Sequence, residues 1–424
     1  NMADTFYVSR LGTSASGAVG IVFSLMAIIQ SVGFTIGMGS GSLISRLLGA
    51  HKTVRANKVA ASGFYSSFFF GILLSVFGLL FIDSLMHSLG ATDTILPYAR
   101  AYARYILFAA PVMAASFVLN NILRAEGRAK SAMMGIAAGG ILNCALDPLF
   151  IFTFKLGIAG AAIATALSQC VGFAILLSFF LRGKTITSLN ISGISRHRYI
   201  YLQILETGFP SFCRQGLASI ATVALNVNAA VYGDAAVAAM SIVGKIFIFI
   251  FSIIIGIGQG YQPVLGYNYG AKIYKRVREA FSFTLKATSV MMTTGATVLF
   301  ITAPGIMKLF IPHDAEVIKI GATALRAQCI AMPLIPLLVM CNMTFQTIGK
   351  SWTATFLSSA RQGFFFLPLI LILPRFIGLT GVQITQALAD VLTFLCCLPF
   401  IIHFFRNLGA PGGKRLETPR AALD

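Results

Sequence analysis

Charged residues are scarce in this sequence. They account for 11% of the 424 residues, whereas a soluble globular protein is about 25% charged. Hydrophobic residues account for 57%. So little charge excludes an ordinary soluble domain and predicts a protein that crosses a membrane many times.

The sequence also lacks the ~10-residue segments of alternating polarity that a transmembrane barrel would show. Its apolar residues gather instead in eleven windows, each longer than the ~20 residues that a spanning helix needs. The windows lie near 14–47, 57–82, 99–123, 131–154, 158–181, 204–232, 235–267, 280–303, 319–347, 353–377 and 379–405. The sequence therefore predicts an all-α integral membrane protein.

The chain starts at Asn1, and its first apolar stretch, "NMADTFYV", stops before Arg10. Such a short stretch is typical of the end of a helix that began earlier. We therefore expect twelve transmembrane helices, the first of them truncated.

Acidic residues are the scarcer of the two charged types, with 13 against 32 basic residues and a formal net charge of +19. The basic residues concentrate in alternate connectors, near 46–58, 124–130, 182–198, 272–278 and 350, and in the tail at 406–420. Cytoplasmic loops show this enrichment, so these connectors and the C-terminus are predicted to be cytoplasmic. Topology thus accounts for the net charge, and we expect no nucleic-acid partner.

The two halves of the chain align when the sequence is shifted by 221 or 222 positions, as in transporters built from two similar halves. The shift pairs Gly12 with Gly233, Gly39 with Gly260, Arg104 with Arg326, Pro111 with Pro333, Asn120 with Asn342, Gly127 with Gly349, and Gly157 with Gly378. We therefore predict an N-terminal lobe at 1–181 (end of the first helix through the sixth), a cytoplasmic interlobe linker at 182–203, a C-terminal lobe at 204–407 and a cytoplasmic tail at 408–424.

One predicted span, "ILNCALDPLFIF" at 141–152, carries a carboxylate. Asn143 and Asp147 are four residues apart and so project from one helical face. Pro148 has no amide hydrogen, which frees the carbonyl of Cys144 and predicts a kink. An unpaired charge at mid-membrane costs at least ~3 kcal/mol, so Asp147 is a candidate proton carrier.

Further polar residues extend this candidate site. Asp4 supplies a second carboxylate, Thr165 supplies a hydroxyl from the next span, and Asn120 is a possible extension of the network. Such a set can share a proton or form an oxygen cage for sodium, and residue identity does not choose between them. The alternative is that these are satisfied structural polar groups.

The second half has no acid at the positions that match Asp147 and Asp4. It carries its own charges deep in predicted helices, namely Arg214, Lys245, Arg361 and Asp390. A salt-bridged interior and a substrate-facing wall would each explain them. Lys245 and Asp390 are the pair to test first.

Motifs of other functional classes are missing. The seven cysteines have no zinc-like CxxC spacing, and no His–carboxylate grouping is typical of a metal ligand set. A catalytic Ser/His pair, an HExxH helix motif and paired acids are also missing. We therefore expect neither an enzyme nor a metal or organic cofactor, apart from a coupling proton or sodium ion.

Several stretches resemble the multidrug and toxic compound extrusion (MATE) family, especially its DinF-like branch. They are "MADTFYVSRLG", "LRAEGRAKSAM", "NCALDPLFIF", "LGIAGAAIATALSQ" and "TGFPSFCRQG", which lie between residues 2 and 216, and with the two-half repeat the resemblance spans nearly the whole chain. The resemblance implies two six-helix bundles that form a V around a cavity with alternating access. It also implies cation-coupled antiport through residues that match Asp4, Asn143, Asp147 and Thr165. The family's other main branch has an acidic site in the C-terminal lobe, where Asp390 is the one candidate.

The expected function is therefore that of a secondary active antiporter. It would export lipophilic, often cationic, small organic compounds in exchange for protons or sodium ions. A flippase for a lipid-linked saccharide, on the same superfamily fold, is the alternative. We expect a monomer surrounded by membrane lipid in the inner membrane of a bacterium.

Overall fold

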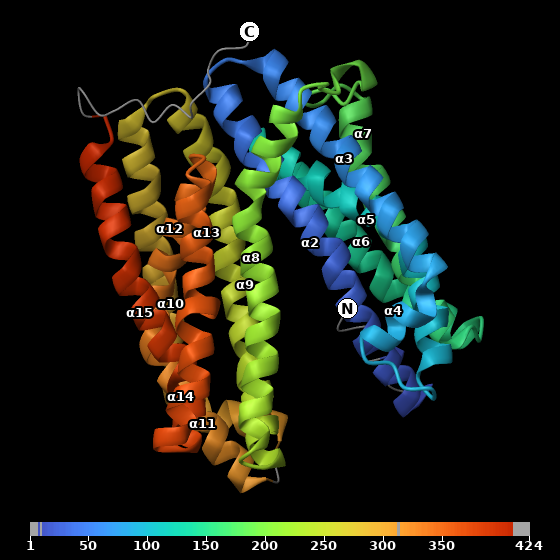
Figure 1. Cartoon of the computed structure of the whole chain (residues 1–424), viewed down its shortest axis with the longest axis vertical. Coiled ribbons are helices and arrows are strands. Elements are labelled where there is room, and N and C mark those ends of the chain that lie inside the picture. Colours follow the sequence, from blue (N-terminus) through green and yellow to red (C-terminus); the bar gives the residue numbers. More distant parts are fainter. Residues whose placement is uncertain (1–6, 9–10, 312–313, 410–424) are drawn as a thin grey trace. The chain divides into compact units, whose positions relative to one another are not determined.

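Every regular element is a helix in the residues that this computed structural model describes, which are 7–8, 11–311 and 314–409 (Figure 1). The first half contains α2 (Thr13–Gly49), α3 (Thr53–Leu80), α4 (Ile82–Ser88), α5 (Leu96–Ala125), α6 (Ala129–Pro148), the π-helical η2 (Leu149–Thr153), α7 (Gly157–Leu181) and the short η3 (Ile191–Gly193). After α8 (Arg198–Ala230), the second half contains α9 (Asp234–Gly270), α10 (Tyr274–Phe310), α11 (Ala315–Ala331), η4 (Met332–Leu334), α12 (Ile335–Thr347), α13 (Ser351–Ser359), the π-helical η5 (Ala360–Phe366), α14 (Leu367–Ile377) and α15 (Leu379–Asn407). The predicted all-α class is confirmed.

Ten helical segments of the described residues are long and apolar enough to cross a membrane. They cover ten of the eleven predicted windows. The eleventh is occupied by the 33-residue helix α8, whose hydropathy is lowered by polar residues that include Glu206, Arg214 and Asn228. The predicted truncated helix falls on the first ten residues, of which only 7 and 8 are described.

The backbone repeats its unusual conformations in the two halves. Positive φ angles occur in matching pairs, at Gly12 (127°) and Gly233 (95°), His51 (59°) and Lys272 (60°), Gly127 (80°) and Gly349 (85°), and Gly157 (56°) and Gly378 (61°). The side-chain amides of Asn120 and Asn342 likewise donate to the carbonyls of Ala132 and Ala354, each at 2.8 Å. The internal repeat is therefore present in the structure as well as in the sequence.

Each half is a separate compact unit, Asn1–Phe212 and Cys213–Asp424. In the first unit α5 is the central helix, with 78% of its apolar window buried. In the second unit the corresponding segment, α11 to α12, is 67% buried. The remaining spans surround the central segment of their own unit. Many large apolar side chains on these outer spans are exposed, as expected for a surface that contacts lipid.

The division between the units falls inside α8 and not at residue 204. The first turns of α8 belong to the first unit because Ile200 and Ile204 are buried in its core. Helix α8 also begins at Arg198, so the predicted linker at 182–203 ends earlier than expected. A continuous helix gives no change of composition that would mark this boundary.

The linker itself is held to the first unit by Glu126, at the end of α5. Its carboxylate oxygens accept hydrogen bonds from the backbone amides of Ile186 and Thr187, each at 2.9 Å. Asn57 and Ser62 accept two further amides of the linker. These bonds satisfy backbone donors that have no helix to pair with.

Two glycines let α8 approach α2. A Cβ atom added at Gly208 would lie 1.8 Å from the carbonyl oxygen of Thr35, and one added at Gly39 would lie 2.0 Å from that of Ile204. Real Cβ atoms do not come so close to backbone oxygens. Close helix contact through glycine is typical of membrane proteins.

Gly208→Ala is therefore expected to lower the stability of the protein by roughly 1–3 kcal/mol, because the added methyl group forces the two helices apart. Thermal unfolding of the purified protein in detergent measures the effect. Gly216→Ala is the matched control on the same helix, since no described atom lies within 4 Å of its added Cβ and alanine favours a helix. Equal melting temperatures for the two variants would show that the contact at Gly208 contributes nothing.

Candidate functional site

The candidate cation site lies where α6 and α7 pack closely. Gly139 and Gly172 allow this approach, because an added Cβ would lie 3.1 Å from the carbonyl oxygen of Ser168 and 2.9 Å from that of Gly135, respectively. Short polar side chains can therefore meet between the two helices. Asn143 and Asp147 project from α6, and Thr165 projects from α7.

The amide of Asn143 joins the three side chains. Its Nδ2 donates to Oδ1 of Asp147 at 3.1 Å and to Oγ1 of Thr165 at 3.3 Å. All three residues are buried, and Asp147 has no exposed surface. The structure thus brings together three of the four residues that the sequence predicted for this site.

The helix changes its winding directly after Asp147. Helix α6 ends at Pro148, and the five residues Leu149–Thr153 continue as the π-helical η2. Proline removes one backbone donor, and single wide turns of this kind are frequent at functional sites. Where the sequence predicts a kink, the helix changes from α to π winding directly after Pro148.

The site is rich in oxygen. Asp147 offers carboxylate oxygens, Thr165 offers a hydroxyl oxygen, and the Asn143 amide offers an oxygen when it is rotated by 180°. Oxygen atoms of these types are the ligands of hard cations, and a protonated carboxylic acid could donate to the same amide oxygen. Among the described residues, no group of three or more His, Cys, Asp or Glu side chains could hold a metal ion.

The structure does not place the two remaining predicted residues, Asp4 and Asn120, in this cluster. Asp4 lies outside the described residues. Asn120 donates its amide to the carbonyl oxygen of Ala132, which precedes Asn143 by eleven residues on α6, or about 16 Å along the helix axis. Asn120 thus ties α5 to α6 at a distance from the cluster and does not extend the network directly.

A second buried cluster lies in the other unit. Arg361, in η5, donates from Nε to Oδ1 of Asp390 at 2.6 Å and from Nη2 to Oδ2 at 3.3 Å. Gln386 donates to the same Oδ1 at 3.1 Å. The guanidinium carbon lies 5.2 Å from the ring centroid of Phe247 and 4.6 Å from that of Phe251.

This cluster corrects the pair that the sequence singled out. Asp390 is fully buried and pairs with Arg361, whose side chain is 13% exposed. Lys245 is exposed on α9. Arg361 and Asp390 therefore form part of a salt-bridged interior, which was one of the two explanations left open.

Arg214 has a different partner. Its Nη1 donates to Oδ1 of Asn342 at 3.3 Å, and the Asn342 amide donates to Ser358 Oγ at 2.6 Å as well as to Ala354. Asn342 makes the same hydrogen bond to a backbone carbonyl as Asn120 does in the first half. Arg214 adds to it a contact between α8 and α12.

Sequence reasoning missed Gln386 and the two phenylalanines. The signal was the same as for the first cluster, because Gln386 precedes Asp390 by four residues as Asn143 precedes Asp147. Phe247 and Phe251 are also four apart, and residues at this spacing share one helical face.

Comparison with known proteins extends these observations. The family model MatE matches residues 1–149 and 210–372. The multidrug export protein MepA of Staphylococcus saprophyticus is 26% identical over 419 residues, which cover 99% of this chain and 90% of that protein. MepA of Staphylococcus haemolyticus is also 26% identical, with coverages of 96% and 87%.

Solved structures show the same fold. A MOP superfamily transporter from Pyrococcus furiosus superposes with a TM-score of 0.90 at 28% sequence identity, over 97% of this chain and 92% of that one. The outward-facing structure of a multidrug resistance MATE family transporter gives a TM-score of 0.91 at 28% identity, with coverages of 96% and 92%. The similarity therefore extends over nearly the whole chain.

Proposed function

The chain belongs to the MatE family of transporters, and from this premise we propose that it is a secondary active antiporter. It exports lipophilic, often cationic, compounds in exchange for protons or sodium ions. The relatives named as multidrug export proteins support this substrate class. The proposal rests on one observation of the structure, the fully buried Asp147 that meets Asn143 and Thr165 inside a spanning segment.

The three side chains can alternate between two arrangements. When Asp147 is ionised, the Asn143 amide donates to Oδ1, and the hydrogen bond at 3.1 Å supports this arrangement. When a proton or sodium ion binds, Asn143 turns its oxygen toward the site and Thr165 loses the bond from Asn143. Cation binding thereby changes the hydrogen bonds between α6 and α7.

This local change can bias transport because each state favours a different ligand. A cation that binds one conformation of the N-terminal unit more tightly shifts the equilibrium toward that conformation. Export follows if the conformation with bound cation binds the compound weakly and the conformation without it binds the compound well. The resemblance adds Asp4 as a second carboxylate in this step.

The flippase alternative receives less support from the second unit. Recognition of a lipid-linked pyrophosphate needs cations that can turn toward it. Arg361 is engaged by Asp390 through two hydrogen bonds, and Arg214 donates to Asn342. Two of the three cations weighed for the flippase are thus engaged and Lys245 alone is exposed, which favours the exporter over the flippase.

The chain crosses the membrane several times, and the finer topology is part of the proposal. The connectors rich in lysine and arginine lie in the cytoplasm, as does the C-terminus. The membrane is the inner membrane of a bacterium, in which a monomer carries out transport.

Efflux from living cells tests the proposal. A pump-deficient bacterium that makes the protein is expected to extrude preloaded ethidium several times faster than cells without it. Dissipating the proton gradient with an ionophore, or removing external sodium, identifies the coupling ion because one of the two treatments should stop the extrusion. Extrusion that survives both treatments would contradict cation exchange, and transfer of a labelled polyprenyl lipid without ethidium efflux would favour the flippase.

A further inference from the structure

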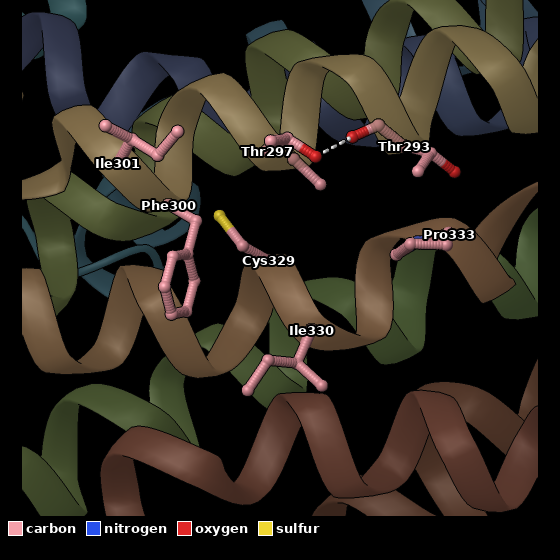
Figure 2. A pocket seen from close by; sticks show the side chains of 8 residues that line it. Thr293, Thr297, Phe300, Ile301, Cys329, Ile330 and Pro333 are labelled. Atoms are coloured by element: carbon pink, nitrogen blue, oxygen red, sulfur yellow. Dashed lines mark hydrogen bonds between the residues drawn. The ribbon is translucent and has the colours of Figure 1, made fainter.

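A groove with a volume of about 230 Å³ opens between α10 and α11, both in the second unit. Figure 2 shows it from close by, with Cys329 of α11 pointing toward α10 between Phe300 and Thr297. Thr293, Ile330 and Pro333 complete much of its lining. The transport proposal does not use this groove, and none of the residues predicted from the sequence as a site lines it.

The internal repeat explains why the two helices leave space here. In the first unit, α3 comes close to α5 because an added Cβ at Gly71 would lie 2.5 Å from Cα of Pro111, and one at Gly78 would lie 2.5 Å from the side chain of Leu107. Gly71 and Gly78 correspond to Met292 and Leu299 in α10. The two glycines that allow the close approach in the first unit are thus replaced by larger residues in the second.

The facing position widens the gap further. The buried Leu107 of α5 corresponds to Cys329 of α11, whose side chain is smaller. The second unit therefore has larger residues on α10, where the first unit has glycine on α3. It has a smaller residue on α11, where the first unit has leucine on α5. We infer that these two differences in residue size favour an open groove between the helices.

The groove has an apolar lining although two threonines contribute to it. The hydroxyl of Thr297 donates to the carbonyl oxygen of Thr293 at 2.9 Å, as the dashed line in Figure 2 marks, and that of Thr293 donates to Ser289 at 2.8 Å. With their hydroxyls bonded to the helix backbone, the threonines expose methyl groups. Ile301 and Ile330, which are 70% and 71% exposed, extend the apolar surface outward.

One cation lies at the rim of the groove. Nε of Arg326 donates to the carbonyl oxygen of Phe300 at 3.3 Å, and the guanidinium carbon lies 5.6 Å from the centre of the Phe300 ring. Arginine has five N–H donors, and the residue is exposed. Its guanidinium can therefore bind an anion while it keeps its contact with Phe300.

The depth of Arg326 suits a lipid headgroup. Residues 327–347 carry no charged side chain, and this stretch has the roughly 20 residues that span the hydrocarbon core. Arg326 is the last charged residue before it. We therefore expect the guanidinium to lie near the boundary between headgroups and acyl chains, with the apolar groove on its hydrocarbon side.

We propose that this groove binds one acyl chain of an anionic phospholipid, whose phosphate pairs with Arg326. The combination of an apolar slot and one cation at its end matches a molecule with an apolar tail and an anionic head. A volume of about 230 Å³ is smaller than the ~300–1,000 Å³ of pockets for drug-sized ligands. The groove therefore holds part of a single chain rather than an exported compound.

Lipid retention tests the headgroup contact. The full protein is purified from membranes into detergent, incubated with phosphatidylglycerol or phosphatidylethanolamine, and examined by native mass spectrometry. Wild type is expected to retain one phosphatidylglycerol in preference to phosphatidylethanolamine, and Arg326→Ala to reduce this retention at least fivefold. Arg104→Ala is the matched control, because Arg104 is the exposed counterpart of Arg326 on α5, where α3 approaches closely.

Filling the groove tests the acyl-chain contact without removing a charge. Cys329→Leu introduces the residue that occupies the equivalent position of the first unit. It is expected to reduce cross-linking of a photoreactive phosphatidylglycerol to the peptides of α10 and α11, with the melting temperature maintained. Equal lipid retention by Arg326→Ala and Arg104→Ala, or unchanged cross-linking in a folded Cys329→Leu protein, would overturn the proposal, as would displacement of the lipid by ethidium.

Discussion

Asp147→Asn is expected to reduce gradient-driven export to the level of cells that lack the protein. Asparagine has nearly the same size as aspartate, and its side-chain oxygen can accept the hydrogen bond from Asn143 that Oδ1 of Asp147 accepts at 3.1 Å. The variant therefore keeps the fold at a cost of about 1 kcal/mol, the worth of one altered hydrogen bond. It loses the group that can change charge inside the span, and without that change no cation is exchanged. Ethidium efflux at equal membrane abundance of the two proteins measures the loss.

Asp83→Asn is the control for this result. Asp83 lies on α4 and forms an ion pair with Arg100 on α5, and both side chains are about half exposed. Exposed pairs contribute about 0–1 kcal/mol, so the variant should export at nearly the wild-type rate. Gradient-driven efflux that persists in Asp147→Asn would mean that the exchanged cation binds elsewhere in the protein, and the cluster of Asn143, Asp147 and Thr165 would then be structural.

The meeting of Asn143, Asp147 and Thr165 could be predicted because it depends mainly on spacing within one helix. Residues four apart share a face, and a carboxylate in a long apolar window has few acceptable surroundings. Thr165 lies on the very next span, and α6 and α7 are packed through small residues. Residues close together in the sequence were therefore enough to predict that these three side chains meet.

The partner of Asp390 could not be predicted in the same way. Lys245, Arg361 and Asp390 lie on three different helices, so their contacts depend on how each helix is rotated. Arg361 also lies in the π-helical η5, where the winding departs from the 3.6 residues per turn on which a sequence pattern relies. The Arg361 side chain thus points in a different direction from the one that it would take in a regular α-helix.

The groove beside Arg326 shows a further limit of sequence reasoning. The repeat aligned Arg104 with Arg326 and Pro111 with Pro333, but the alignment alone did not reveal the groove beside Arg326. The residues at the helix contact differ, since Gly71 and Gly78 have the larger counterparts Met292 and Leu299 in α10. Identical residues at aligned positions indicate that the two halves share a fold. Differences in residue size at those positions indicate where only one half has a groove.

The buried pair of Arg361 and Asp390 gives the second large effect. Asp390→Leu alone and Arg361→Met alone are each expected to lower the free energy of unfolding by about 3–5 kcal/mol, since either leaves an uncompensated buried charge. The double variant should recover most of this loss, because two apolar side chains of similar size need no charge partner. Unfolding of the purified protein in mixed micelles of increasing SDS fraction measures all three free energies, and the double-mutant cycle gives the interaction between the two residues.

Lys245→Met is the control, because Lys245 is exposed and its replacement should change stability by no more than ~0.5 kcal/mol. Arg361→Lys adds a stricter test. A lysine cannot reproduce the two-point hydrogen bonding of the guanidinium to Asp390 together with its contact to the Phe251 ring, so this variant should be less stable than wild type although the charge is kept. Additive losses in the double variant would show that the two residues act independently. A coupling of several kcal/mol would instead show that η5, α15 and the aromatic face of α9 are held together through one ion pair, which makes the π-helical turn a fixed part of the C-terminal unit.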